Sequence, residues 1–320
     1  MKKLITLIFV TLVTSIVFLF FQYENGSVIR VGGATLPTPL LERLFRDYEV
    51  LNSQAIHYQS VGSGVGIDDF LRGKYDFAVS DIYQRDSDSV TSNLIYVPFS
   101  IGIVSIAYYL PNNPQIKLTG ELISSIFSGQ ITHWNDKAIQ IVNPQVVLPE
   151  IRIRVVTRLD ESGTESIFRD YLRAVSPGTS PNQFVGDRVN GNQAMQDFIK
   201  TQMGAIGFVG LPYAVRDSLS VAWIQNKQGK FIKPSASVAS VAANNDMEQL
   251  PVSIANSTSR YAYPIVGLSW IVVDKRRDNT QIKPLLLWLL SDGQGYHNQY
   301  QFAPLPNRVQ KRIKSQIQDI

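Results

Sequence analysis

Three short segments rich in glycine and in serine or threonine are the parts of this sequence best suited to chemistry. They occupy residues 32–37, 61–66 and 158–165, and each lies between an apolar run that predicts a strand and a segment that predicts a helix. The first turn of a helix exposes unpaired N–H groups and the positive end of the helix dipole, which suits an anion. Glycine lets a ligand approach the backbone, and hydroxyl groups add donors. Together the three segments predict an anion site, although each alone could be only a capped helix.

Two charged residues sharpen this prediction. Arg158 ends a predicted strand, and a guanidinium can hold an oxyanion with two N–H groups. Asp81 follows the strand predicted at 77–80. A carboxylate beside an anion is unfavourable unless the anion carries a proton, which phosphate does near neutral pH and sulfate does not. The alternatives are a surface arginine paired with Asp160 and an aspartate that caps a turn.

The scaffold that would position these residues alternates strands with helices. Strands are predicted at 28–31, 55–60, 77–80, 151–156 and 204–209. Helices are predicted at 37–50, 67–71, 122–127 and 167–172. This alternation is typical of a parallel α/β sheet, in which ligands bind at the carboxyl ends of the strands.

The length of the chain predicts more than one structural unit. A chain of 320 residues is long for a single domain. Two very apolar stretches, 97–110 and 265–273, mark the places where the chain would cross between units. We therefore predict two α/β lobes, with residues 28–100 plus 260–320 in lobe 1 and residues 101–259 in lobe 2.

The N-terminal segment predicts export. Met1-Lys2-Lys3 is basic and residues 4–21 carry no charge, which is the pattern of an export signal. The apolar run is also just long enough to span a bilayer, and no clean small-x-small cleavage site precedes Gly26. A cleaved signal and a retained anchor both stay open for residues 1–27. Either one places the remaining chain in the periplasm or cell envelope.

Composition argues against several kinds of site. The sequence has no cysteine, so disulfides, thiolate metal sites and cysteine nucleophiles are excluded. His57, His133 and His297 are not in a metal-ligand spacing, and neither Ser63 nor Ser162 lies in a Gly-x-Ser-x-Gly motif. We therefore predict no catalytic residue, no metal ion and no cofactor. The net charge of +4 is not concentrated in a patch, so no nucleic-acid partner is predicted.

Several motifs together resemble the phosphate-binding protein of bacterial ABC phosphate importers, of the type II periplasmic-binding-protein-like family. The motifs keep their order and are Gly33–Pro39 (GATLPTP), Gly62–Gly64, Ser80-Asp81, Ile126–Asp136 (IFSGQITHWND), Arg158–Thr164 (RLDESGT), Gly204–Phe208 (GAIGF) and, more weakly, Ala262–Ile265. The segment from Arg158 to Thr164 is quite specific, whereas glycine motifs alone would not be.

The resemblance implies a two-lobed fold, with two Rossmann-like lobes joined by two crossover strands, that closes over inorganic phosphate. It implies phosphate contacts from Thr35, Leu36, Ser63, Asp81, Arg158, Ser162, Gly163 and Thr164. Asp160 would orient Arg158 from behind. Leu36 departs from the family, which commonly has an aromatic residue there. A contact through the backbone N–H of Leu36 would tolerate that change.

The function implied is high-affinity phosphate binding outside the cytoplasmic membrane and delivery to the membrane permease of an ABC importer. The protein would be a monomer and not an enzyme. Three alternatives stay open: a binder of another tetrahedral oxyanion, a phosphate-sensing regulatory subunit, and a phosphatase or serine hydrolase. Asp81 argues against a fully deprotonated ligand, and the lack of an obvious histidine partner for Ser63 or Ser162 argues against catalysis.

Overall fold

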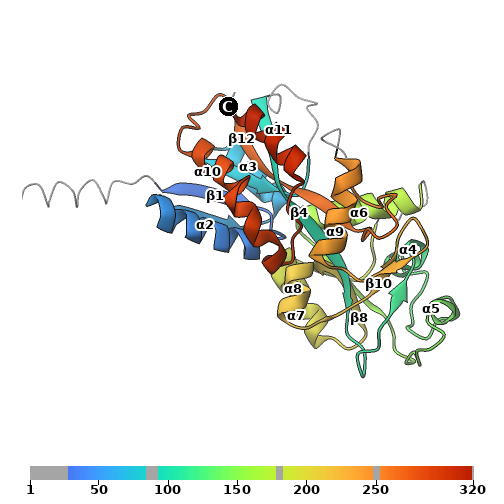
Figure 1. The fold of residues 1–320 in the computed structure, drawn as a ribbon. Coiled ribbons are helices and arrows are strands. Elements are labelled where there is room, and N and C mark those ends of the chain that lie inside the picture. The colour runs from blue at the N-terminus through green and yellow to red at the C-terminus, as the bar shows by residue number, and fades with distance from the viewer. Residues whose placement is uncertain (1–27, 84–92, 178–182, 248–252, 319–320) are drawn as a thin grey trace, which may run out of the picture.

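The computed structural model describes residues 28–83, 93–177, 183–247 and 253–318 (Figure 1). The export signal or anchor predicted at residues 1–27 lies outside these ranges. Within them, none of the helices combines the length and the apolar character that crossing a membrane requires.

Nine strands of the described chain form one large sheet. Their order is β2 (Ile56–Ser60), β1 (Ile29–Gly33), β3 (Phe77–Ser80), β12 (Val266–Asp274), β4 (Leu94–Tyr108), β8 (Ala205–Gly210), β6 (Arg154–Arg158) and β7 (Asp187–Val189), with β9 (Ser220–Val221) also paired to β4. Strands β1, β2 and β3 are parallel, as are β6, β7 and β8. Strand β12 is antiparallel to β3 and β4. A parallel group of strands therefore lies at each end of the sheet.

Strand β4 belongs to both halves of the sheet. Its residues 94–103 pair with β12, and its residues 104–108 pair with β8. Figure 1 shows β4 running from the half that holds β1 and α2 toward the half that holds β8 and β10. The predicted fold class, two α/β lobes joined by crossing strands, is confirmed.

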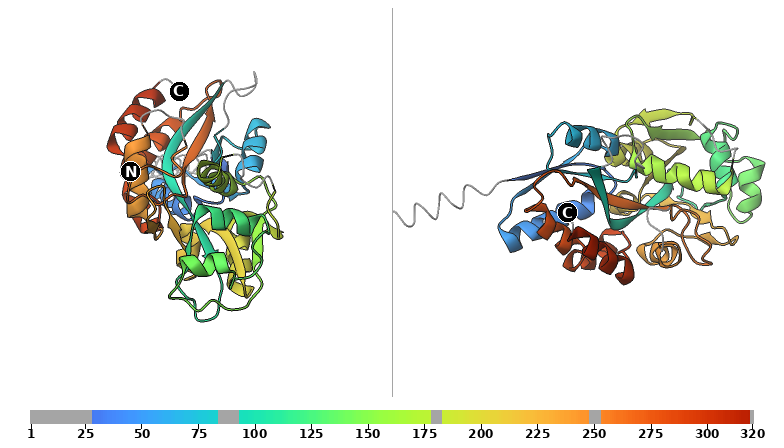
Figure 2. Two further views of the ribbon diagram at one scale, coloured as in Figure 1. Left: turned by 90° about the vertical axis from the view of Figure 1, so that its right-hand side faces the viewer. Right: turned by 90° about the horizontal axis from the view of Figure 1, so that it is seen from above.

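Helices cover the strands in both halves (Figures 1 and 2). The β1–β3 half carries α2 (Thr38–Asn52), α3 (Ser63–Leu71), α10 (Ile282–Leu289), the 3-10 helix η2 (Asp292–Tyr300) and α11 (Asn307–Ile317). The β6–β8 half carries α4 (Gly120–Phe127), α5 (Lys137–Val142), α6 (Gly163–Val175), α7 (Gly191–Thr201), α8 (Leu211–Arg216), α9 (Ala236–Asp246) and a small sheet of β5 (Lys117–Leu118), β10 (Trp223–Gln225) and β11 (Phe231–Ile232). Helix α2 buries Leu40, Leu41, Leu44 and Tyr48, the stripe that its periodicity predicts.

Most predicted elements shift by one or two residues at an end, and helices α3 and α6 and strand β6 differ by more. Helix α6 spans Gly163–Val175, whereas the prediction was 167–172. Helix α3 begins at Ser63, four residues before the predicted start at 67, because Gly66 lets its first turn pack directly on β1. Strand β6 begins at Arg154, whereas the prediction began at 151. The residues before it bond elsewhere: the N–H of Ile153 donates to the carbonyl of Thr132 at 2.8 Å.

The close approach of α3 to β1 gives a stability prediction. A Cβ atom added to Gly66 would lie 2.3 Å from the Cα of Gly33, and backbone on both sides leaves little room to move. We expect Gly66→Ala to lower the free energy of unfolding by about 1–3 kcal/mol, despite the better helix propensity of alanine. Gly295→Ala is the control, because an added Cβ there meets no atom within 4 Å. Urea unfolding of both variants measures the difference, and equal midpoints would contradict the packing argument.

Candidate anion-binding site

The structure brings all the predicted site residues together between the two halves of the sheet. Those that follow the strands of the β1–β3 half are Thr35, Leu36, Ser63 and Asp81. Those at the end of β6 and the start of α6 are Arg158, Ser162, Gly163 and Thr164. All eight residues are buried. The three helix starts therefore converge, as their positions after strands predict.

The two sides of the site touch through their backbones. The N–H of Gly64 donates to the carbonyl of Glu161 at 3.2 Å. A Cβ atom added to Gly163 would lie 2.5 Å from both the Oγ of Ser63 and the Cβ of Asp81. The absence of a side chain at residue 163 thus lets the start of α6 reach the opposite side.

Arg158 is held from behind by Asp160. Its Nε donates to Oδ1 of Asp160 at 2.7 Å and its Nη2 donates to Oδ2 at 2.5 Å. The same Oδ1 accepts from the N–H of Gly191 at 3.1 Å. The remaining nitrogen, Nη1 of Arg158, is buried and has no hydrogen-bond partner in the described part of the chain. The guanidinium therefore presents an unsatisfied donor inside the protein.

Asp81 presents an unsatisfied acceptor. Its Oδ1 accepts from the hydroxyl of Ser269 at 2.5 Å, whereas its Oδ2 is buried without a partner among the described residues. The pairing of β12 with β4 shifts between Ser269 and Trp270, an irregularity of the kind that re-aims side chains near functional sites. Burial raises the pKa of Asp81 to about 7, although the Ser269 hydrogen bond and the charge of Arg158 act in the opposite direction.

The two serine hydroxyls both accept a hydrogen bond from the backbone. The N–H of Asp81 donates to the Oγ of Ser63 at 3.1 Å, and the N–H of Glu165 donates to the Oγ of Ser162 at 3.2 Å. The second bond is the helix cap that the sequence predicts, although the Glu165 carboxylate pairs with Arg169 at 2.8 Å. Each serine keeps its own hydrogen for another acceptor.

Asn192 is a residue of this site that the sequence analysis missed. It is fully buried near the start of α7, and its amide contacts Thr35, Thr164 and Gly210. The segment Asn190-Gly191-Asn192 is a fourth glycine-containing helix start. The signal was weak because the preceding strand, β7, has only three residues and no apolar run.

The side chain of Leu36 packs against two strands of the sheet. A Cβ atom added to Gly102 of β4 would lie 2.6 Å from its Cδ2, and one added to Gly210 of β8 would lie 2.5 Å from its Cδ1. The leucine thus fills the space above two glycines on neighbouring strands. This packing accounts for a buried aliphatic side chain at the position where the resemblance led us to expect an aromatic one.

The histidines are not placed as partners for the site serines. His57 and His133 are exposed, whereas Ser63 and Ser162 are buried. His297 is a buried residue of η2 that faces β4, and its ring nitrogens lie 3.1 Å and 3.2 Å from the carbonyl oxygens of Phe99 and Gly293. Burial lowers the pKa of His297 to about 4 and keeps the ring neutral.

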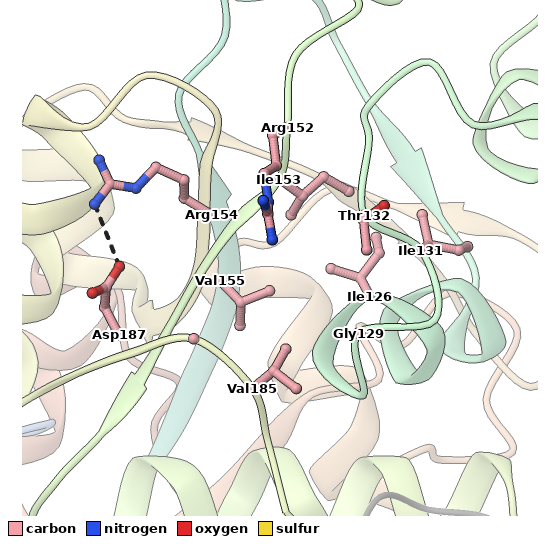
Figure 3. Close-up of a pocket in the computed structure, with 11 residues that line it drawn as sticks. Ile126, Gly129, Ile131, Thr132, Arg152, Ile153, Arg154, Val155, Val185 and Asp187 are labelled. Carbon is pink, nitrogen blue, oxygen red and sulfur yellow. Dashed lines mark hydrogen bonds and ion pairs between the residues drawn. The ribbon is translucent and has the colours of Figure 1, made fainter.

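A separate cavity of about 380 Å³ lies at the opposite end of β6 (Figure 3). Its lining is mixed: Ile126, Val155 and Val185 are among its aliphatic side chains, and Thr132 and Arg152 are among its polar ones. An ion pair at its edge, between Arg154 and Asp187 at 3.4 Å, is exposed. None of the predicted site residues lines this cavity, and it lies away from the strand ends where ligands of α/β sheets bind.

The raised pKa of Asp81 predicts that stability depends on pH. In an unfolded chain an aspartate has a pKa of about 4. The folded, ligand-free protein therefore holds an extra proton between that value and the folded pKa of Asp81 of about 7. Stability should fall as the pH rises through this window. Urea unfolding of phosphate-free protein from pH 5 to 8 should show this fall in the wild type relative to Asp81→Asn, and parallel pH profiles would contradict it.

A two-lobed α/β fold with a buried polar site between its halves defines the class of solute-binding proteins that close around a ligand. A family model described as a PBP superfamily domain matches residues 22–293. The chain is 34% identical over 302 residues to a phosphate-binding protein PstS of Xylella fastidiosa, covering 89% of this chain and 83% of that protein. It is 30% identical over 312 residues to the phosphate-binding protein PstS of Haemophilus influenzae, covering 92% and 93%.

The chain therefore belongs to the PstS family of phosphate-binding proteins within the PBP superfamily, as the motifs predicted. A solved structure of a putative phosphate ABC transporter substrate-binding protein from Clostridium perfringens, with bound phosphate, has a TM-score of 0.68. The match covers 88% of this chain and 100% of that one at 17% sequence identity, so it bears on the fold alone. The relatives are named as binding proteins, not as enzymes.

Proposed function

We propose that this protein binds inorganic phosphate with high affinity outside the cytoplasmic membrane and delivers it to the permease of an ABC importer. The observation that carries the proposal is the pair of buried, unsatisfied atoms, Nη1 of Arg158 and Oδ2 of Asp81. One is a donor and the other an acceptor. Hydrogen phosphate offers both acceptor oxygens and a P–O–H donor, so it satisfies both groups. The names of the relatives support the same ligand.

The remaining phosphate contacts follow from the helix starts. The hydroxyls of Thr35, Ser63, Ser162 and Thr164 are buried beside Arg158 and Asp81. Backbone N–H groups at Leu36 and Gly163 lie at the positive ends of α2 and α6 and add donors for the anion. Asp160 acts indirectly, because its two oxygens fix the guanidinium of Arg158.

Anion binding alone accounts for the residues of this site, without a catalytic role. Its serine hydroxyls serve as hydrogen-bond donors. His57 and His133 are exposed, whereas the site serines are buried, so neither histidine is placed to act as their general base. We therefore infer a non-catalytic carrier with no metal ion or cofactor, and we propose that it is a monomer. Its place is the periplasm or cell envelope, with residues 1–27 as a cleaved signal or an anchor. The unsatisfied acceptor on Asp81 favours phosphate over a fully deprotonated oxyanion.

The ligand test is a competition between phosphate and sulfate. After removal of co-purified phosphate, calorimetry should show tight phosphate binding by the wild type. At pH 8.5, above the folded pKa of Asp81 of about 7, sulfate should compete poorly because it brings no proton to the carboxylate. Asp81→Asn can turn an N–H toward the ligand. It should therefore reduce the ratio of phosphate affinity to sulfate affinity by about one to two decades.

The outcomes of this competition separate two claims. If the wild-type protein binds sulfate with the same affinity as phosphate, the assignment of phosphate as the ligand is wrong. An Asp81→Asn protein that keeps the full discrimination would instead place selectivity elsewhere in the site. Circular dichroism of both proteins controls for folding.

We further propose that the lobes are residues 28–100 plus 260–320 and residues 101–259, and that phosphate closes them. The support is that Ser63 and Asp81 belong to one lobe and Arg158 and Thr164 to the other, so one ligand contacts both. A ligand that touches both lobes favours the closed form by its differential affinity. The radius of gyration from small-angle scattering should therefore decrease on addition of saturating phosphate. Superimposable curves would contradict closure.

A further inference from the structure

The side chain of Asn192 joins both sides of the site through a single amide. Its Nδ2 lies 2.8 Å from the Oγ1 of Thr35 and 2.9 Å from the Oγ1 of Thr164. Its Oδ1 accepts from the backbone N–H of Gly210 at 2.8 Å. Asn192 is fully buried, so water does not compete for these bonds. All the hydrogen-bonding atoms of the amide are thus committed.

The contact with Gly210 fixes which way the amide points. A backbone N–H can only donate, so the oxygen of the amide must face Gly210. The flipped amide would set Nδ2 against that N–H, two donors facing each other in a buried place. Nδ2 therefore faces Thr35 and Thr164, and it has two hydrogens, one for each hydroxyl oxygen.

The direction of these bonds decides where the threonine hydrogens go. A hydroxyl that accepts from Nδ2 must direct its own single hydrogen elsewhere. The Oγ1 of Thr35 also lies 3.2 Å from the backbone N of Asn192 and 3.4 Å from Nη2 of Arg158, which are further donors. Donors thus surround this oxygen on the protein side. The hydrogen of Thr35 is left to meet an acceptor in the site.

We propose that Asn192 is a positioning residue that fixes the hydroxyl hydrogens of Thr35 and Thr164 toward the bound anion. The proposal rests on the proposed phosphate site and deepens it. Asn192 does so on both sides of the site at once, because Thr35 follows β1 and Thr164 lies in α6. The amide thereby selects for a ligand that accepts hydrogen bonds and against one that would present donors to these hydroxyls.

A double-mutant cycle tests whether Asn192 acts through the hydroxyls. Asn192→Ala should weaken phosphate binding by about tenfold or more in the wild-type background. In the Thr164→Val background, where one of the two hydroxyls is absent, Asn192→Ala should weaken phosphate binding by a clearly smaller factor. Gln193→Ala, at an exposed position on the same helix, is the control and should leave affinity unchanged. Thermal unfolding of each variant separates lost affinity from lost stability. Equal fold losses in both backgrounds would overturn the proposal.

A second measurement needs no variant. Neutron diffraction from the deuterated wild-type protein with phosphate should place the deuterons of Thr35 and Thr164 toward phosphate oxygens and those of Nδ2 toward the threonines. Threonine deuterons directed at Asn192 would overturn the inference while leaving the phosphate site intact. A wild-type protein that binds no phosphate in calorimetry would instead defeat the proposed function, and the inference with it.

Discussion

The paired hydrogen bonds between Arg158 and Asp160 are the interaction on which the rest of the site depends. A buried guanidinium without a partner would be strongly destabilising, so the carboxylate makes burial of the arginine possible. The pair also needs space: a Cβ atom added to Gly62 would lie 2.8 Å from Oδ2 of Asp160. Glycine at residue 62 leaves this space free because it has no side chain. Its backbone, at φ 98°, also has a conformation that favours glycine. One nitrogen of the arginine, Nη1, is left without an acceptor among the residues that the structure describes.

The hydroxyls around this arginine share one arrangement. Each of Thr35, Ser63, Ser162 and Thr164 has its oxygen occupied by an N–H donor that the protein holds in place. The donors differ in kind, being backbone groups for the serines and the Asn192 amide for the threonines. The result is the same, because each hydroxyl hydrogen stays available for another acceptor, which in the proposed site is the anion. Such prior orientation reduces the ordering that binding must otherwise impose.

The sequence predicted the features that depend on neighbouring residues, but not those that depend on contacts between residues distant in the sequence. The turns before α2 and α6 were recognisable because a strand, a short turn and a helical segment follow one another within a few residues, with a serine cap at α6. The first residues of α3 and α6 were both placed four residues too late. For α3, Gly66 contacts Gly33 on another element, and such a contact leaves no local pattern. Asn192 was missed for a similar reason: no local pattern links it to Thr35, which is distant in sequence. The carboxylate of Asp81 was expected at a strand end, but its partner Ser269 comes from the returning strand β12.

Strand β4 has a mechanical consequence for the lobes. It is one continuous strand whose first part pairs with β12 and whose second part pairs with β8. A flexible tether would let two bodies explore many relative orientations, whereas a hydrogen-bonded ribbon bends and twists about few axes. The rotations open to the lobes are therefore limited to a narrow family of paths. For the closure proposed above, we therefore expect a short search for the closed arrangement and a small loss of rotational freedom.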